Sequence, residues 1–182
     1  LILELVGGQT LAARIKNGPF QVEETLEICR QIAEGLEAAH EKGIVHRDLK
    51  PSNVMIDKDG GVRLLDFGLA KTFIAAEAAD EGSLRTQTGA VLGTYAYMSP
   101  AQALGRLREV DAQSDVYSLG VILYEMLTWH LPCPVLQGDT SRTLQYLSSE
   151  EGPPRPSTFD RTLRGDLETI VLTCLEKGKG TR

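Results

Sequence analysis

One stretch of the sequence decides the fold: His46-Arg47-Asp48-Leu49-Lys50-Pro51-Ser52-Asn53. A second short motif, Asp66-Phe67-Gly68, follows it along the chain. Between the two, residues 54–56 and 62–65 are short β-type runs, and residues 57–61 are rich in turn formers. The sequence therefore predicts an antiparallel β-hairpin that joins the two motifs.

The register of this hairpin decides which polar side chains meet. If Val54 pairs with Leu65, antiparallel geometry places Asn53 opposite Asp66 at the open end of the hairpin. Directly opposed residues have Cβ atoms about 4.5 to 5.5 Å apart. Two oxygen-bearing side chains at that separation can share one Mg²⁺, a hard cation that takes oxygen ligands. The same register pairs Ile56 with Arg63.

Two further polar residues, Asp48 and Lys50, precede the first strand and would lie beside that ion. They supply a carboxylate to orient a hydroxyl and an ammonium to neutralise a phosphoryl oxygen. At this point the sequence resembles a known family. Residues 46–53 match the catalytic loop of eukaryotic-type protein kinases, H-R-D-L-K-P-x-N, and residues 66–68 match their D-F-G motif. Lys50 is typical of the serine/threonine kinases, and the segment 93–100 resembles bacterial members.

The resemblance implies an α+β fold, mainly α, that corresponds to the C-terminal lobe of a protein kinase. That lobe is a helical bundle with a short β-hairpin carrying the catalytic loop. We expect one partial kinase domain over residues 1–182, made of a hinge remnant (1–8), the catalytic loop (46–53), the activation segment (66–101) and a helical subdomain (102–182). The N-terminal lobe and the last helix are expected to be absent, because no glycine-rich loop precedes the hinge and the chain stops early.

Apolar periodicity predicts helices over residues 10–17, 22–42, 111–129, 140–149 and 166–176. The second of these should bury one face, formed by Val22, Leu26, Cys29, Ala33, Leu36 and His40. The middle of the third is apolar nearly all round, which predicts a helix buried on every side. In the resemblance, Asp115 of this helix braces the backbone of the catalytic loop.

The resemblance assigns the chemistry to five residues. It implies that Asp48 orients the substrate hydroxyl and that Lys50 stabilises the transferring phosphoryl group. The hydroxyl of Thr94 would bridge these two side chains. Asn53 and Asp66 would hold Mg²⁺ and the polyphosphate of ATP.

Three residues are implied in nucleotide binding. Glu4 and Val6 lie in the segment that matches the hinge, whose backbone would hydrogen-bond adenine. Met55 would pack under the adenine ring. A frayed terminal strand and ordinary core packing explain the same residues without a nucleotide.

Three residues are implied in regulation. An Arg before the catalytic Asp pairs with an activation-loop phosphate in the family, which assigns that role to Arg47. Thr86 and Thr88 stand where the activation loops of related bacterial kinases carry phosphorylatable residues. A salt bridge for Arg47 and solvated hydroxyls for the threonines are the alternatives.

The sequence departs from the family at Ala101, where the family has a Glu. That Glu normally pairs with a buried Arg, which is matched here by Arg182. Removing one partner of a buried ion pair costs about 3 to 5 kcal/mol. Either Arg182 is solvated, or the lobe is weakened.

Composition excludes several classes of protein. The chain has 182 residues, 42% of them hydrophobic, which is enough for one domain with a core. Its net charge of −6 argues against a nucleic-acid partner. No apolar run reaches the roughly 18 residues that span a bilayer, so we expect no membrane segment in this chain. Three widely spaced cysteines indicate reduced thiols and a cytoplasmic location.

These observations predict a serine/threonine protein kinase that uses ATP and Mg²⁺ to phosphorylate hydroxyls of protein substrates. Self-association for autophosphorylation is a further expected partnership. The alternative is a pseudokinase, or an interaction module with a kinase fold but no turnover, which Ala101 and the altered end of the chain favour. Lys50 disfavours a small-molecule phosphotransferase. Without the lobe that positions ATP, the chain as given is expected to be inactive.

Overall fold

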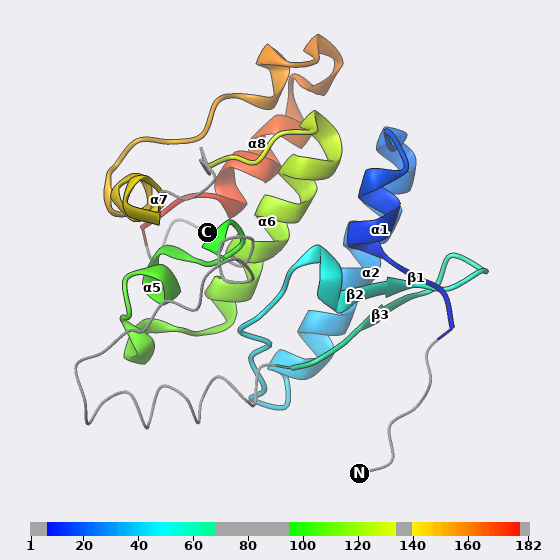
Figure 1. Ribbon diagram of the computed structural model, residues 1–182, viewed down its shortest axis with the longest axis horizontal. Helices are drawn as coiled ribbons and strands as arrows, with labels where there is room; N and C mark the ends of the chain where they lie inside the picture. Colours follow the sequence, from blue (N-terminus) through cyan, green and yellow to red (C-terminus); the bar gives the residue numbers. More distant parts are fainter. Residues whose placement is uncertain (1–6, 68–94, 134–139, 179–182) are drawn as a thin grey trace.

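The computed structural model describes residues 7–67, 95–133 and 140–178. Over these ranges the chain is mainly helical with one small antiparallel sheet, which confirms the predicted mixture of many helices and a short hairpin (Figure 1). The helices are α1 (Leu11–Lys16), α2 (Val22–His40), α5 (Pro100–Ala103), α6 (Ala112–Thr128), α7 (Thr140–Ser148) and α8 (Asp166–Cys174). Short 3₁₀ turns are η1 (Pro51–Asn53), η2 (Leu107–Glu109), η3 (Pro156–Thr158) and η4 (Arg161–Leu163). The strands are β1 (Gln9–Thr10), β2 (Val54–Ile56) and β3 (Val62–Leu64).

Helix α2 packs against both α6 and β3, and its buried side chains belong to one hydrophobic core. Its buried face differs from the predicted one. Ile28, Ile32 and Leu36 are buried with Thr25, Cys29 and Ala39. Leu26 is 43% exposed and Ala33 is exposed, so the prediction for these two positions was wrong. The larger side chains Ile28 and Ile32 bury more apolar area than Ala33 does. This difference favours the observed orientation, in which the face that carries Ile28 and Ile32 points into the core.

Helix α6 is the central helix of the bundle, and most of its side chains are buried, as predicted. It begins at Asp111, whose side chain accepts a hydrogen bond from the backbone of Gln113 and forms a capping box with Ser114. Val116 and Leu119 remain half-buried. Helix α8 packs closely on α6, because Gly120 leaves no side chain between the two backbones.

The hairpin forms, but its register differs by one residue from the prediction. Val54 pairs with Leu64, and Ile56 pairs with Val62. The backbone nitrogen of Leu65 donates to the carbonyl oxygen of Asn53 at 2.8 Å, so Leu65 and not Asp66 lies opposite Asn53.

The turn explains this shift. The backbone nitrogen of Asp57 donates to the carbonyl of Gly61 at 2.9 Å, and Asp57 Oδ1 accepts from the nitrogen of Gly61 at 2.8 Å. These bonds make Asp57 and Gly61 the closing pair and leave only residues 58–60 in the loop. Gly60 takes φ +85°, the left-handed geometry that three-residue hairpin loops require. The predicted pairing of Ile56 with Arg63 placed six residues, 57–62, between the strands, one more than the observed pairing of Ile56 with Val62.

A third strand, which the sequence did not predict, completes the sheet. In β1, Gln9 pairs with Ile56 and Thr10 pairs with Met55. The sheet order is β1-β2-β3, so β2 is the central strand. Met55 therefore lies between two neighbouring strands, immediately after the loop that contains the catalytic-loop motif.

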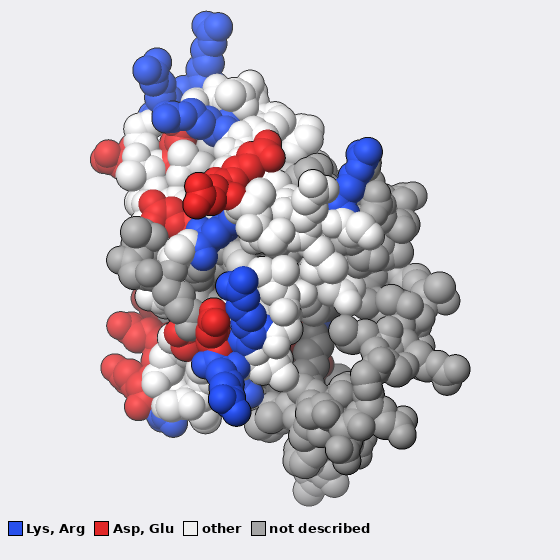
Figure 2. Space-filling model, turned by 90° about the vertical axis from the view of Figure 1, so that its left-hand side faces the viewer, with Lys and Arg blue, Asp and Glu red and all other residues white. Residues whose placement is uncertain are grey.

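Charged side chains of both signs share the face shown in Figure 2. Lys and Arg gather at the end of the molecule formed by η3 and η4, at the top of Figure 1. There Arg155, Arg161 and Arg164 line a cavity of about 500 Å³ with Ser157 and Glu168. The acidic chain thus has a local basic surface. Among the described residues, no helix is both long enough and apolar enough to cross a bilayer.

Candidate active site

The loop from Asp48 to Asn53 brings three functional groups together, as the sequence predicted. Lys50 Nζ donates to Asp48 Oδ2 at 2.9 Å, and Asn53 Nδ2 donates to the same oxygen at 3.2 Å. Asn53 Nδ2 also donates to the backbone carbonyl of Asp48 at 2.8 Å. Pro51 starts the 3₁₀ turn η1, which folds the chain back so that these contacts form. A carboxylate, an ammonium and an amide therefore share one small site.

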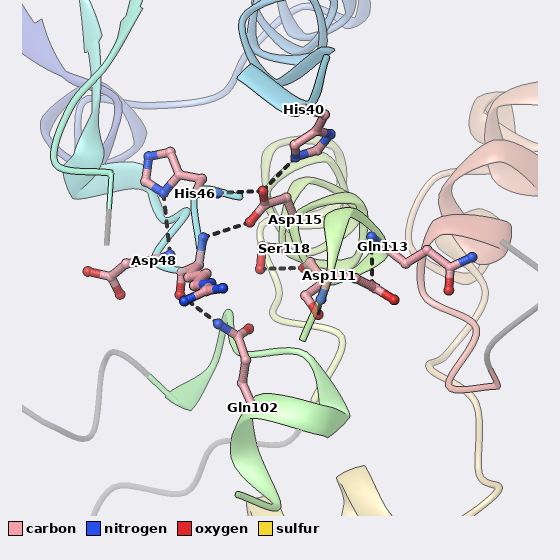
Figure 3. Close-up of polar contacts among 10 residues, drawn as sticks. His40, His46, Asp48, Gln102, Asp111, Gln113, Asp115 and Ser118 are labelled. Carbon is pink, nitrogen blue, oxygen red and sulfur yellow. Dashed lines mark hydrogen bonds and ion pairs between the residues drawn. The ribbon is translucent and has the colours of Figure 1, made fainter. Parts of the chain in front are cut away.

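Asp115 holds the backbone at the start of this loop through hydrogen bonds. It is fully buried on α6. Its Oδ2 atom accepts from the backbone nitrogen of His46 at 2.8 Å, and its Oδ1 atom accepts from the nitrogen of Arg47 at 2.9 Å. His40, at the end of α2, contacts Oδ2 through Nε2 at 2.8 Å (Figure 3). These bonds confirm the predicted bracing role of Asp115.

Arg47 has an unusual backbone conformation, with φ +64°. For a residue with a side chain, this left-handed geometry costs on the order of 1 to 3 kcal/mol and persists only where neighbours hold it. Asp115 holds the backbone nitrogen of Arg47. Gln102 Nε2, on α5, donates to the carbonyl oxygen of Arg47 at 2.6 Å. The prediction missed Gln102, although the pattern Ser99-x-x-Gln102 is a readable capping box.

His46 links the two sequence motifs. Its Nδ1 atom accepts from the backbone nitrogen of Asp48 at 3.3 Å, so Nε2 carries the hydrogen and donates to the carbonyl of Leu65 at 3.1 Å. Its ring lies 4.6 Å from the ring of Phe67. Burial lowers the pKa of His46, which is fully buried and therefore neutral at physiological pH. His46 is therefore a buried residue whose two ring nitrogens are both hydrogen-bonded.

Asn53 and Asp66 carry the oxygens that could hold a divalent cation. The side chain of Asn53 donates through Nδ2 to Asp48, and Asp66 is exposed with φ +52°. Among the described residues, no hydrogen bond or ion pair engages Asn53 Oδ1 or the Asp66 carboxylate. One amide oxygen and one carboxylate are a donor set that suits Mg²⁺. The corrected register removes the direct pairing of the two residues, so their sharing of one ion remains a prediction.

A narrow crevice joins the loop to its surroundings. It is lined by residues from three places in the chain: Arg47, Asp48, Leu49, Lys50, Tyr97, Met98, Gln102 and Ser118. Ser118 Oγ donates to the carbonyl of Tyr97 at 2.7 Å, and Tyr97 Oη donates to Glu125 Oε2 at 2.6 Å. Burial raises the pKa of Tyr97 and of Glu125. The segment after residue 95 is thus attached to α6 beside Asp48.

The remaining predicted site residues divide into two groups. Met55 is half-buried on β2, the strand that follows η1. The others lie outside the described residues: Glu4, Val6, Thr86, Thr88, Thr94 and Arg182. Their roles therefore stay predictions.

Comparison with known proteins places this geometry in a family. The model of the protein kinase domain matches residues 1–182. A probable serine/threonine-protein kinase of Streptomyces coelicolor is 42% identical over 97% of the chain, which spans 25% of that protein. Serine/threonine-protein kinase PknB of Mycobacterium tuberculosis is 39% identical over the whole chain, which spans 28% of it. A probable serine/threonine-protein kinase of Corynebacterium efficiens is 35% identical, with 27% of its length covered.

The chain thus spans about a quarter of the length of the curated relatives it matches. The family model covers every residue, including the loop in which Asp48, Lys50 and Asn53 meet. The chain therefore belongs to the protein kinase domain family.

Proposed function

We propose that the natural protein containing this chain is a serine/threonine protein kinase that transfers the γ-phosphate of ATP to protein hydroxyls. One observation carries the proposal: the Asp48 carboxylate is held between Lys50 Nζ and Asn53 Nδ2. The names of the relatives, which are serine/threonine-protein kinases, support it. We assign the chain to the large lobe of the domain, with the boundaries given in the sequence analysis.

The chain's own residues suggest how the reaction is assisted. Asp48 accepts a hydrogen bond from the substrate hydroxyl and orients its oxygen toward the phosphoryl group. Lys50 lies 2.9 Å from the same carboxylate, so its ammonium is close to the point where negative charge develops. The fixed loop backbone keeps both groups oriented before substrate arrives, which lowers the entropic cost of reaction.

Asn53 and Asp66 are proposed to hold Mg²⁺, because a side-chain amide oxygen and a carboxylate suit a hard cation. When bound, the ion would neutralise charge on the polyphosphate of ATP. The amide nitrogen of Asn53 stays on Asp48, so one side chain would connect the metal to the carboxylate. Asn53 therefore has a double role, as a hydrogen-bond donor to Asp48 and as an oxygen ligand.

The remaining roles are proposals of the same kind. Thr94 would bridge Asp48 and Lys50, and Arg47 would sense a phosphate on Thr86 or Thr88. Glu4, Val6 and Met55 would contact adenine. Protein substrates, and self-association for autophosphorylation, are the proposed partners.

A kinase-fold module without turnover is the alternative. Ala101, in place of the family Glu, favours it. However, α5 still forms around this position, and Gln102 connects it to the catalytic loop. The hydrogen-bonded Asp48 and the available metal ligands have no purpose in a pure scaffold, so we favour the enzyme.

The test is Mg²⁺-dependent transfer of labelled phosphate by the full natural protein. Three peptides of one sequence would differ only in a Ser, Thr or Tyr acceptor. The proposal predicts labelling of Ser and Thr peptides, none of Tyr, and loss of transfer when Mg²⁺ is chelated. It also predicts that residues 1–182 alone transfer no phosphate. Absence of transfer by the folded full protein would support the module instead.

A further inference from the structure

Gln102 makes two different contacts with the two ends of its amide. Its Oε1 atom accepts from the backbone nitrogen of Ser99 at 3.0 Å, as part of the capping box at the start of α5. Its Nε2 atom donates to the carbonyl oxygen of Arg47 at 2.6 Å. The amide orientation is chemically fixed, because a flip would set nitrogen against the Ser99 N–H and oxygen against the Arg47 carbonyl.

The contact with Arg47 lies next to the proposed catalytic carboxylate. The carbonyl of Arg47 and the nitrogen of Asp48 belong to one planar peptide group. Gln102 holds the oxygen side of that group, and His46 Nδ1 holds the nitrogen side at 3.3 Å. Asp115 holds the preceding peptide through the nitrogen of Arg47. The direction in which the Asp48 side chain leaves the backbone is therefore set by three anchors.

These anchors come from different parts of the chain. Asp115 belongs to the buried α6, and His46 to the loop itself. Gln102 alone belongs to α5, which follows the segment between residue 68 and residue 94. Figure 3 shows its side chain reaching from α5 toward the loop that carries Asp48. Movement of α5 would therefore pull directly on the peptide group that orients Asp48.

We propose that Gln102 is a positioning residue that couples α5 to the orientation of Asp48. The inference rests on the proposed function of Asp48. The contact is exposed to solvent, so water can replace it in part when it is lost. We therefore expect an effect of one net hydrogen bond, about three- to tenfold in rate.

The decisive variant is Gln102→Glu in the full natural protein. A Glu keeps the oxygen that accepts from Ser99, and it is a favoured residue at this capping position. It loses the donor to Arg47. The matched control, Ser99→Ala, removes the capping hydroxyl and keeps the donor. Comparing the two separates positioning from helix capping.

We expect Gln102→Glu to lower kcat about three- to tenfold, with unchanged KM for ATP and unchanged thermal midpoint. Ser99→Ala should lower the thermal midpoint and leave kcat within about twofold. The ratio of wild-type to Gln102→Glu rates should shrink as pH falls toward the Glu pKa of about 4.3, because a protonated Glu donates again. Wild-type kcat in Gln102→Glu, or an equal loss in Ser99→Ala, would overturn the proposal.

Amide hydrogen exchange gives a readout that needs no activity. The backbone N–H of Asp48 should exchange faster in Gln102→Glu and at the wild-type rate in Ser99→Ala. If the wild type transfers no phosphate, the proposed function fails, and the exchange data still decide whether Gln102 holds the loop. Unchanged exchange at Asp48 in both variants would contradict the coupling.

Discussion

Asp115 Oδ2 lies 2.8 Å from the backbone nitrogen of His46, which is 69 residues earlier in the chain. One buried carboxylate on the central helix thus fixes the start of the catalytic loop. The same carboxylate accepts from Arg47 and contacts His40. These partners donate hydrogen bonds to the Asp115 carboxylate. They therefore compensate for its burial, which would be costly for an unpaired carboxylate.

Replacing Asp115 by Asn should destabilise the protein strongly. The amide offers one acceptor atom in place of two, and its NH₂ group would face a backbone N–H in a fully buried position. We expect the free energy of unfolding to fall by about 2 to 3 kcal/mol in urea titrations. Asp111→Asn on the same helix is the control and should cost under about 0.5 kcal/mol, since Asn caps as well as Asp. Equal effects of the two variants would contradict the bracing role.

The neutral His46 should make stability depend on pH. Its folded pKa is lowered by burial, so between that value and about 6.5 the unfolded state binds more protons. The free energy of unfolding should therefore fall as pH drops below about 6.5. Glu125, whose pKa burial raises, acts in the opposite direction and is present in every variant.

The measurement is the free energy of unfolding between pH 7.5 and 5.5 for the wild type and for His46→Gln, which does not titrate. The wild type should lose stability more steeply on acidification than the variant. Parallel curves would mean that His46 is protonated equally in both states. Neutral burial in the core would then be refuted.

Gly120 is predicted to be the tightest point between α6 and α8. A Cβ there would lie 2.6 Å from Cys174 Cβ and 3.3 Å from a methyl of Leu175. Gly120→Ala should therefore cost about 1 to 3 kcal/mol, because α8 must move away. The control is Gly35→Ala in α2, where the nearest atom, 3.2 Å away, is the flexible end of Leu64.

Gly35→Ala should be close to neutral, because the helix preference of Ala, worth about 0.5 to 1 kcal/mol, offsets the crowding. Thermal unfolding of both variants provides the comparison. If Gly120→Ala unfolds at the wild-type temperature, the claim that α6 and α8 pack closely at Gly120 is contradicted.

Asn53→Asp tests the double role of Asn53. As a metal ligand alone, Asn53 could be replaced by Asp, which is a stronger ligand for Mg²⁺. The structure predicts the opposite result, because the new carboxylate would face Asp48 and lose the donors at 2.8 and 3.2 Å. We expect phosphate transfer to fall at every Mg²⁺ concentration, measured against the exposed control Ser52→Ala. Full activity of Asn53→Asp would show that hydrogen-bond donation from Asn53 to Asp48 is not needed for phosphate transfer.

The residues alone predicted mainly local features, whereas the distant contact of Asp115 with the loop was implied by the family resemblance. The meeting of Asp48, Lys50 and Asn53 was predictable, because a proline turn and six residues of chain bring them together. The hairpin was also predictable from its two apolar runs. Its register was not, because Asp57 and Gly61 close the turn with hydrogen bonds that residue types alone do not reveal.

Tertiary contacts account for the other differences. The face of α2 was misassigned because Leu26 and Ile28 are both apolar, and only packing against α6 and β3 decides between them. Strand β1 is two residues long and exists only because β2 lies beside it. The role of Gln102 was not predicted, because its hydrogen-bond partner, Arg47, is 55 residues away in the sequence.

The most direct test of the account is the rate of phosphate transfer by Asp48→Asn in the full natural protein. The account predicts that kcat falls at least about 100-fold while the affinity for ATP is retained, because a general base contributes on the order of 10² to 10⁴. Asp59→Asn, in the exposed hairpin turn, is the control and should transfer at the wild-type rate. Wild-type transfer by a folded Asp48→Asn protein would contradict the central claim that Asp48 acts on the substrate hydroxyl.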